Sequence, residues 1–232
     1  MRGGTGHDKS GAAIAPTAAH CGPGAIPLRF AVMQSRFIAV EGPIGVGKSS
    51  LVDLLATRFS AVKVMEKIEN PFLRDFYREK PGAAFQAQLF FLLNRFMQQR
   101  DLAQTDLFQQ VTLSDYIFAK DKIFAYLNLD DSELMLYERL YGLLSEKVPR
   151  PDLVIYLQAA TPVLADRIKK RRRDYESEIA DKYLEELNQA YSYFFYHYKD
   201  TPLLVIDTTD IDFVKNESDL EDLVAQIESM GK

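Results

Sequence analysis

The feature that most restricts the fold of this chain is a glycine-rich octapeptide between two apolar segments. Residues 42–49 read GPIGVGKS and match the pattern G-x-x-x-x-G-K-[ST]. The preceding segment, Arg36–Glu41, is predicted to be a buried strand, and the following one, Lys48–Arg58, is predicted to be a helix. Backbone N–H groups of such a loop, at the positive end of a helix, form a cradle for phosphate groups. The motif therefore predicts a nucleoside triphosphate site on an α/β fold.

Two side chains of this loop are expected to act directly on the nucleotide. The ammonium of Lys48 would reach the β- and γ-phosphates, and the hydroxyl of Ser49 would bind Mg²⁺. A glycine-rich turn with an exposed lysine is the alternative, and the strand and helix around the motif disfavour it. The N-K-x-D and D-x-x-G patterns of GTPases do not occur after Lys48, which disfavours a GTPase. The loop residues expected to bind ATP are Gly42, Pro43, Ile44, Gly45, Val46, Gly47, Lys48, Ser49 and Ser50.

Short apolar segments alternate with longer periodic ones along the rest of the chain. Further strands are predicted at Ala61–Met65, Gln110–Ser114, Asp152–Leu157 and Leu203–Ile206. Helices are predicted through Phe85–Phe96 and at Ser132–Ser145, Pro162–Lys170, Ile179–Tyr198 and Glu217–Met230. This alternation is typical of a parallel sheet covered by helices. We expect the P-loop NTPase fold, an α/β fold with a five-stranded parallel sheet flanked by helices.

Charge and composition narrow the range of partners. The chain has 28 Lys and Arg against 33 Asp and Glu, a net charge of −5, which is a poor match for nucleic acid or an anionic membrane surface. No apolar window reaches the roughly 18 residues of a membrane span. Its one cysteine, Cys21, cannot form an internal disulfide. We expect small-molecule partners and a cytoplasmic location.

The first residues differ in composition from the remainder. Six of the 12 glycines, two of the three histidines and Cys21 lie in the first 24 residues. Such a segment buries too little apolar surface to offset the entropy of ordering it. We expect residues 1–32 to be a disordered extension and residues 33–232 to form the folded domain.

Two further features point to the chemistry at this nucleotide. The run IKKRRRD at Ile168–Asp174 holds five consecutive cations in an acidic protein. This run is either a solvent-exposed charge run or nucleic-acid patch, or an arginine-rich lid over the transferred phosphate. The concentration of positive charge at one helix junction of an acidic protein favours the lid. Glu66 directly follows the second predicted strand, at the sheet edge where such folds bind ligands. It is either a surface carboxylate or part of the site.

A polar line on the predicted helix through Phe85–Phe96 suggests an acceptor pocket. Gln88, Leu92 and Arg95 are spaced i, i+4, i+7, on one side of a largely apolar helix. Two hydrogen-bonding side chains aimed at a buried region need partners. They form either a polar pair between packed helices or a site that recognises a polar heterocycle.

Taken together, six blocks of the sequence resemble the deoxynucleoside kinases, specifically the bacterial deoxyadenosine/deoxyguanosine kinase type related to mammalian deoxycytidine and deoxyguanosine kinases. The resemblance spans Phe37 to about Tyr198. The blocks are EGPIGVGKSS, Glu66 with NPFLRDFY, FQAQLFFLLNR, SDYIFAKDKIFA, RPDLVIYL and RIKKRRRDYE. The resemblance implies phosphorylation of a deoxynucleoside 5′-hydroxyl in nucleotide salvage, with Mg·ATP as donor and a homodimer as assembly.

The resemblance also implies individual roles. Glu66 corresponds to the carboxylate that accepts the proton of the 5′-hydroxyl, and Asp115 to an acid near Mg²⁺. The other implied positions are Tyr77 and Glu176 on the 3′-hydroxyl, Gln88, Arg95 and Asp121 on the base, Phe124 stacked on the base, Arg171 and Arg173 in the lid, and Arg167 over the ATP side. From the proposed base readers we expect deoxyadenosine, deoxyguanosine or deoxycytidine rather than thymidine, and the bacterial resemblance implies a preference for purines.

Two departures from the family pattern stand out. Many relatives have Asp/Glu-Arg-Ser after the third strand, whereas this chain has Asp115-Tyr116, so Lys120, Lys122 or a lid arginine would have to share the arginine's task. In the lid, Arg172 replaces the usual glycine. A thymidylate kinase-like enzyme is the nearest alternative, but its phosphorylated acceptor favours an arginine where Tyr116 stands. A noncatalytic ATP-binding protein or a nucleic-acid-dependent ATPase is the alternative of another class.

Overall fold

The structure is a computed structural model, and it describes residues 36–104, 111–171 and 179–230. The predicted extension at residues 1–32, the lid residues Arg172 and Arg173, and Glu176 lie outside the described residues. All described residues fall within one compact unit of the chain, residues 32–232.

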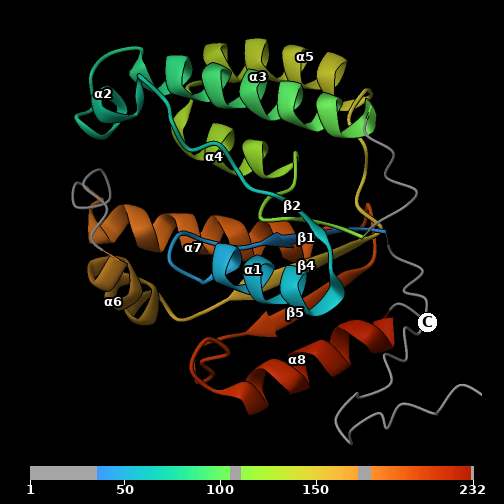
Figure 1. Ribbon diagram of the computed structural model, residues 1–232. Helices are drawn as coiled ribbons and strands as arrows, with labels where there is room; N and C mark the ends of the chain where they lie inside the picture. The colour runs from blue at the N-terminus through green and yellow to red at the C-terminus, as the bar shows by residue number, and fades with distance from the viewer. Residues whose placement is uncertain (1–35, 105–110, 172–178, 231–232) are drawn as a thin grey trace, which may run out of the picture. The chain divides into compact units, whose positions relative to one another are not determined.

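A five-stranded parallel sheet forms the centre of this unit (Figure 1). Its order is β2-β3-β1-β4-β5, so the strand before the glycine-rich loop is the central one. The strands are β1 (Phe37–Glu41), β2 (Val62–Val64), β3 (Thr112–Ser114), β4 (Leu153–Gln158) and β5 (Leu203–Asp207). The predicted fold class is confirmed, because each predicted strand is present and all four pairings are parallel.

Eight helices are described, and the predicted helices are all among them. They are α1 (Lys48–Phe59), α2 (Leu73–Tyr77), α3 (Ala83–Gln104), α4 (Lys120–Asn128), α5 (Asp131–Ser145), α6 (Thr161–Arg171), α7 (Asp181–Tyr196) and α8 (Glu217–Met230). Helices α2 and α4 were not predicted. They have only 5 and 9 residues, too few for an apolar period to show.

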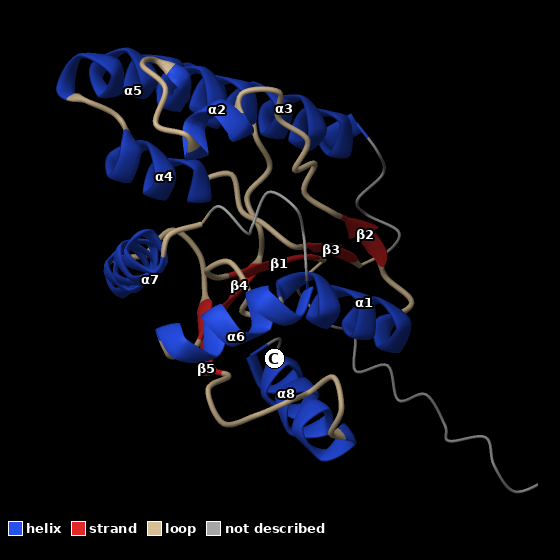
Figure 2. Cartoon of the chain, turned by 90° about the vertical axis from the view of Figure 1, so that its left-hand side faces the viewer, coloured by secondary structure: helices blue, strands red, loops and turns tan. Residues whose placement is uncertain are grey.

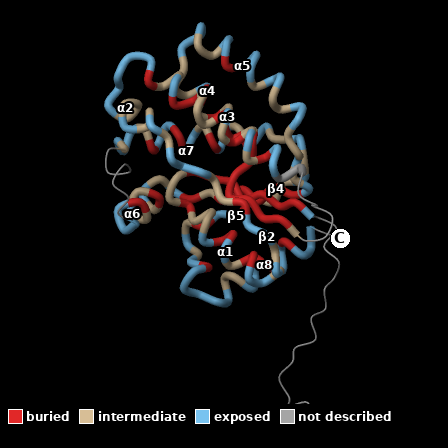
Figure 3. Tube along the Cα trace, turned by 45° about the horizontal axis from the view of Figure 1, so that its top comes forward, coloured by how far each residue is buried: buried red, intermediate tan, exposed pale blue. Residues whose placement is uncertain are grey.

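Side-chain alternation along β1 divides the core into two layers. Ile38 and Val40 pack on one face with apolar residues of α1, α6 and α8, whereas Ala39 packs on the other with residues of α4 and α7. Because both faces are covered, all five residues of β1 are buried. Figure 3 shows that burial is concentrated in the sheet at the centre of the described chain. Burial on both faces explains why this strand reads as a continuous apolar run.

A third apolar cluster joins α3, α4 and α5. It centres on the buried side chains of Leu92, Ala125 and Tyr137, together with Phe118 from the segment before α4. Figure 2 shows these three helices on the side of the sheet opposite α1, α6 and α8. Helix α3, which carries the polar line of Gln88 and Arg95, therefore lies on this side of the sheet. No described helix combines the length and the apolar character that crossing a membrane would require.

Candidate active site

The glycine-rich loop connects β1 to α1 and depends on glycine at two positions. A Cβ on Gly42 would lie 2.3 Å from the carbonyl oxygen of Leu157 on β4, which real Cβ atoms do not tolerate. Gly47, the N-cap of α1, has φ +107, a conformation that residues with a Cβ rarely adopt. The conformation of the loop therefore requires glycine at both places: Gly42 where the loop lies against β4, and Gly47 where α1 begins.

Lys48 folds back over this loop. Its Nζ donates to the carbonyl oxygens of Gly42 at 2.7 Å and Pro43 at 3.1 Å. Burial, followed by the nearby charge of Lys120, lowers the pKa of Lys48 from 10.5 to about 8. An ammonium held by loop carbonyls can exchange those contacts for phosphate oxygens.

Ser49 and Asp115 form an oxygen pair beside the loop. The Ser49 hydroxyl donates to Asp115 Oδ2 at 2.9 Å, and Asp115 Oδ1 accepts from the backbone N–H of Glu66 at 2.6 Å. Hydroxyl and carboxylate oxygens are ligands that Mg²⁺ accepts, and it usually takes only one or two carboxylates plus phosphates. Within the described residues there is no larger cluster of His, Cys, Asp or Glu suited to a metal. The pair fits a nucleotide-bound Mg²⁺.

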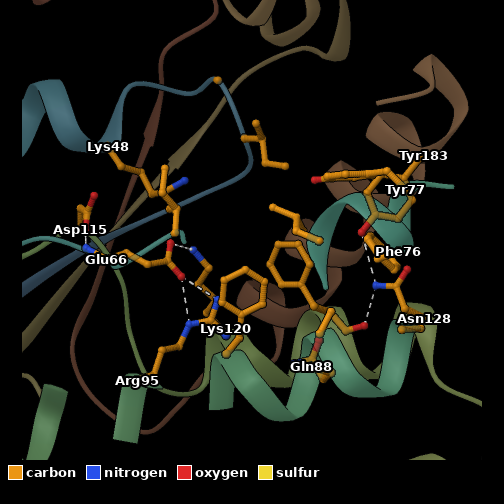
Figure 4. Close-up of a pocket in the computed structure, with 18 of the residues that line it drawn as sticks. Lys48, Glu66, Phe76, Tyr77, Gln88, Arg95, Asp115, Lys120, Asn128 and Tyr183 are labelled. Atoms are coloured by element: carbon orange, nitrogen blue, oxygen red, sulfur yellow. Dashed lines mark hydrogen bonds and ion pairs between the residues drawn. The ribbon is translucent and has the colours of Figure 1, made fainter. Parts of the chain in front are cut away.

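Glu66 lies just after β2 and is clamped by two cations (Figure 4). Its Oε1 accepts from Arg95 Nη2 at 2.6 Å and Nε at 2.9 Å, and its Oε2 accepts from Lys120 Nζ at 2.6 Å. Burial alone would raise the pKa of this carboxyl, but Lys120 and then Arg95 outweigh it and bring the pKa from 4.5 to about 2. Glu66 is therefore ionised at any physiological pH.

Tyr116 helps to place Glu66 rather than to supply charge. The tyrosine is fully buried, and its hydroxyl donates to Gln98 Oε1 on α3 at 3.0 Å. Gln98 in turn donates to the backbone carbonyl of Met65 at 2.7 Å. This chain of hydrogen bonds fixes the residue immediately before the carboxylate.

Asp121 lies behind Arg95. It is fully buried; one carboxylate oxygen pairs with Arg95 Nη1, and the other accepts from the Tyr137 hydroxyl at 2.9 Å. Its backbone carbonyl accepts from Gln88 Nε2 at 2.9 Å. Asp121 thus orients both Gln88 and Arg95, which line the cavity, whereas its own carboxylate does not.

A single cavity connects the phosphate loop with α3. It brings together many of the predicted site residues from separate parts of the chain. Its lining consists of Ile44, Gly45, Lys48, Ser49, Glu66, Ile68, Leu73, Phe76, Tyr77, Ala84, Ala87, Gln88, Phe91, Arg95, Asp115, Lys120, Phe124, Asn128, Arg171 and Tyr183. In Figure 4, Lys48, Glu66 and Asp115 lie at one end, and Tyr77, Asn128 and Tyr183 lie at the other.

The far end of the cavity contains residues that the sequence did not single out. Asn128 donates to the backbone carbonyl of Phe124 at 2.8 Å and to the Tyr183 hydroxyl at 3.3 Å. The ring of Phe76 contacts those of Tyr77 and Tyr183, with centroids 5.1 and 6.1 Å away. Only Phe76 had a signal in the sequence, its place beside Tyr77 in the block NPFLRDFY. Asn128 and Tyr183 belong to α4 and α7, which pack together in the fold but are 55 residues apart at these positions.

The two described arginines of α6 have different surroundings. Arg167 donates to the hydroxyl and carbonyl oxygens of Thr208 at 3.0 and 2.8 Å, and more weakly to the carbonyl of Val46 at 3.4 Å. It therefore ties the phosphate loop to the segment after β5. Arg171, at the end of α6, lines the cavity.

Comparison with known proteins identifies the family. The family model for deoxynucleoside kinase matches residues 38–231. Deoxyguanosine kinase of Bacillus subtilis is 36% identical over 200 residues, covering 84% of this chain and 97% of that protein. Deoxyadenosine/deoxycytidine kinase of the same organism is 28% identical over 207 residues, covering 86% and 94%.

Solved structures show the same similarity. Deoxyadenosine kinase from M. mycoides with the products dCMP and dCDP superimposes with a TM-score of 0.72 at 26% identity, covering 83% of this chain and 99% of that one. The same enzyme with bound dATP gives a TM-score of 0.70 at 26% identity, covering 83% and 98%. With the family matched over almost all of the described residues, this chain belongs to the deoxynucleoside kinases, which are phosphotransferases.

Proposed function

We propose that this enzyme transfers the γ-phosphoryl group of ATP to the 5′-hydroxyl of a purine deoxynucleoside. The observation that carries the proposal is the cavity that runs from Lys48 and Glu66, past Arg95, to Gln88 and Tyr77. The carboxylate of Glu66 lies at the end of the cavity beside the phosphate loop. Helix α3 contributes hydrogen-bonding side chains along the cavity wall. A hydroxyl at the first end and a heterocycle farther along would match these groups.

Glu66 is the proposed proton acceptor. Because the carboxylate is ionised and lies near Lys48, it can accept the hydroxyl proton as the oxygen attacks the γ-phosphorus. Tyr77 lines the cavity and is proposed to hold the sugar 3′-hydroxyl, together with Glu176.

Arg95 and Gln88 are the proposed base readers. A guanidinium donates, and a carboxamide both donates and accepts, so together they can match the N7, O6 and N6 positions that distinguish purines. One of the two relatives is named for deoxyguanosine and the other for deoxyadenosine and deoxycytidine, so two of the three named acceptors are purines. Phe124 lines the same cavity and is proposed to stack on the base.

ATP is proposed to bind the phosphate loop with Mg²⁺ held by Ser49 and Asp115. The hydrogen-bonded oxygen pair of these side chains supports this assignment. When bound, Mg²⁺ neutralises charge on the β- and γ-phosphates. Arg171 in the described part of α6, and Arg173 beyond it, are proposed to contact the transferred phosphoryl group, with Arg167 near the ATP side.

A substrate panel tests the proposed reaction. The four deoxynucleosides and dTMP are each incubated with the enzyme and Mg·ATP, and ADP formation is measured with and without acceptor. We expect deoxyguanosine and deoxyadenosine to give the highest kcat/KM. Turnover of dTMP above all nucleosides would instead support a thymidylate kinase-like enzyme, and ATP hydrolysis that ignores every acceptor would support an ATPase.

The enzyme is also proposed to be a homodimer. Helices α4 and α7 share a groove lined largely by apolar and aromatic residues, where Tyr126 is 56% and Tyr193 is 72% exposed. Exposed aromatic surface of this kind is typical of protein contacts. Light scattering should give a dimer for the wild type, a monomer for Tyr193→Asp, and a dimer for the control Val214→Asp on another surface. A monomeric wild type would contradict the proposal.

A further inference from the structure

We propose that Lys120 is a catalytic residue whose ammonium binds the attacking 5′-oxygen while it holds Glu66. This inference rests on the proposed function, because it concerns the hydroxyl that Glu66 would deprotonate. Many relatives have an arginine where this chain has Tyr116, after β3, and tyrosine carries no positive charge. The proposal assigns that charge to Lys120, the first residue of α4.

The burial of Lys120 is the first observation. The residue is only 4% exposed, and a buried ammonium is costly unless it is paired. Its Nζ lies 2.6 Å from Glu66 Oε2 but 4.0 Å from Glu41 Oε1. Glu41 has other partners, since its carboxylate accepts from the backbone N–H groups of Gly42 and Ile117 and from the Tyr191 hydroxyl. The close partner of Lys120 is therefore the proposed base.

The direction of Lys120 is the second observation. Its side chain lines the nucleotide cavity, and Figure 4 shows it reaching Glu66 from the side of α4. An ammonium has three donor hydrogens, and Glu66 accepts one of them. A hydroxyl oxygen that donates its proton to Glu66 would lie beside the same ammonium. Lys120 can therefore bond the carboxylate and the substrate oxygen together.

The other candidates for this task lie elsewhere or have other partners. Tyr116 has no charge and points to Gln98. Lys122, two residues along α4, places its Nζ 4.5 Å from the ring centroid of Tyr141, on a different surface. Arg95 is held by Asp121 as well as by Glu66. Lys48 is bonded to the phosphate loop. Arg171 lines the same cavity from α6, and the proposed function assigns it to the transferred phosphoryl group. Lys120 is the cation bonded to Glu66 Oε2.

The chemistry is balanced without a further group. The 5′-hydroxyl proton passes to Glu66, the oxygen forms a bond to the γ-phosphorus, and the bond from phosphorus to the bridging oxygen of ADP breaks. Lys120 stays protonated and stabilises the charge that develops on the 5′-oxygen. Because Lys120 also lowers the pKa of Glu66, its loss should make the free carboxyl less acidic.

Variants at Lys120 test the role, with a control at Lys63, an exposed lysine of β2 that pairs with Asp53. We expect Lys120→Met to lower kcat by about 10²-fold or more, the scale of losing one preorganised donor, while the Kd for ATP changes less than about threefold. Lys120→Arg should recover at least about tenfold of that loss, because it restores the charge. The acidic limb of the kcat/KM profile should move to higher pH in Lys120→Met. Lys63→Met should match the wild type in all three measurements.

The outcomes separate this inference from the proposed function. If the wild type phosphorylates no deoxynucleoside, the proposed function fails. If the wild type is active and Lys120→Met keeps its kcat and its acidic limb, only the role of Lys120 is overturned. Should Lys120→Met lose its thermal transition, Lys120→Gln takes its place. A folded Gln variant with wild-type kcat would likewise overturn the role.

Discussion

Arg95 joins the base end of the cavity to the reacting end, because one of its nitrogens lies 2.6 Å from Glu66 Oε1 while another pairs with Asp121. The same guanidinium lies 4.9 Å from the ring centroid of Phe91, so Phe91 is a third residue that holds it in place, after Glu66 and Asp121. A side chain proposed to read the base is therefore in direct contact with the carboxylate proposed to take the proton. Binding of the correct base and readiness of Glu66 are physically connected through Arg95.

Glu66→Gln tests the proton acceptor. We expect kcat to fall by about 10²-fold or more, the scale of general-base catalysis, because an amide cannot take the hydroxyl proton. ATP affinity should stay nearly unchanged, since Lys48 and the loop carry that binding. Steady-state kinetics and ATP titration check both. Full kcat in this variant would direct the search for the acceptor to Asp115.

Acid stability tests the clamp on Glu66. Its pKa is about 2 in the folded protein and near 4.5 when unfolded, so its contribution is fully present above pH 4.5 and is lost as the pH falls toward 2. A shift of this size corresponds to about 3 kcal/mol at most.

Urea unfolding at pH 7 and at pH 3 measures that contribution. The wild type should lose more free energy of unfolding between these pH values than Glu66→Gln does, because glutamine does not titrate. Equal losses in the two proteins would show that the clamp contributes nothing to acid stability.

Lys48 should make ATP binding sensitive to alkaline pH. Its pKa in the free enzyme is about 8, so the ammonium that attracts phosphate is present below pH 8 and is lost above it. Between pH 7 and 9.5 the protonated fraction falls about 30-fold, which limits the expected rise in Kd for ATP to that factor. Calorimetric titration at both pH values measures it. Lys48→Ala should bind ATP more weakly and turn over more slowly, without this additional pH dependence.

The sequence was sufficient for the sheet and the phosphate loop but not for the contacts at Glu66. The strand at Phe37–Glu41 and the loop after it are local patterns, and their spacing determines their geometry. The ion pairs of Glu66 join β2 to α3 and α4, over sequence separations of 29 and 54 residues, and periodicity carries no information about such distances. Lys120 was only one of several possible cations, because α4 was too short to predict and the direction of its side chains was unknown.

Removal of residues 1–32 tests the proposed domain boundary. Those residues lack an apolar period and precede the first strand, so the truncated protein should keep its kcat and its free energy of unfolding. Urea unfolding and steady-state assays of both lengths provide the check. A loss of more than about 1 kcal/mol would indicate that the extension packs against the domain.

Asp121→Ala tests base selection. The carboxylate does not line the cavity, so we expect it to act by holding Arg95 in place, with Tyr137 as its other partner. Without Asp121, Nη1 of the guanidinium loses its partner, while the contacts of Arg95 with Glu66 and Phe91 remain. A site built around hydrogen bonds can discriminate by about 10⁴, so the variant should reduce the preference for purines over thymidine more than it reduces the best kcat.

The control for that variant is Tyr137→Phe, which removes only the 2.9 Å hydrogen bond to Asp121 and leaves the ion pair with Arg95 intact. We expect it to keep most of the preference, because the charge that orients Arg95 remains. The measurement is kcat/KM for all four deoxynucleosides in the wild type and both variants. An unchanged ranking with undiminished ratios in Asp121→Ala, or thymidine as the best substrate of the wild type, would contradict base reading through Arg95. A loss of selectivity as large in Tyr137→Phe as in Asp121→Ala would instead assign the orientation of Arg95 to the hydrogen-bonded pair, since the carboxylate alone would then be unable to hold it.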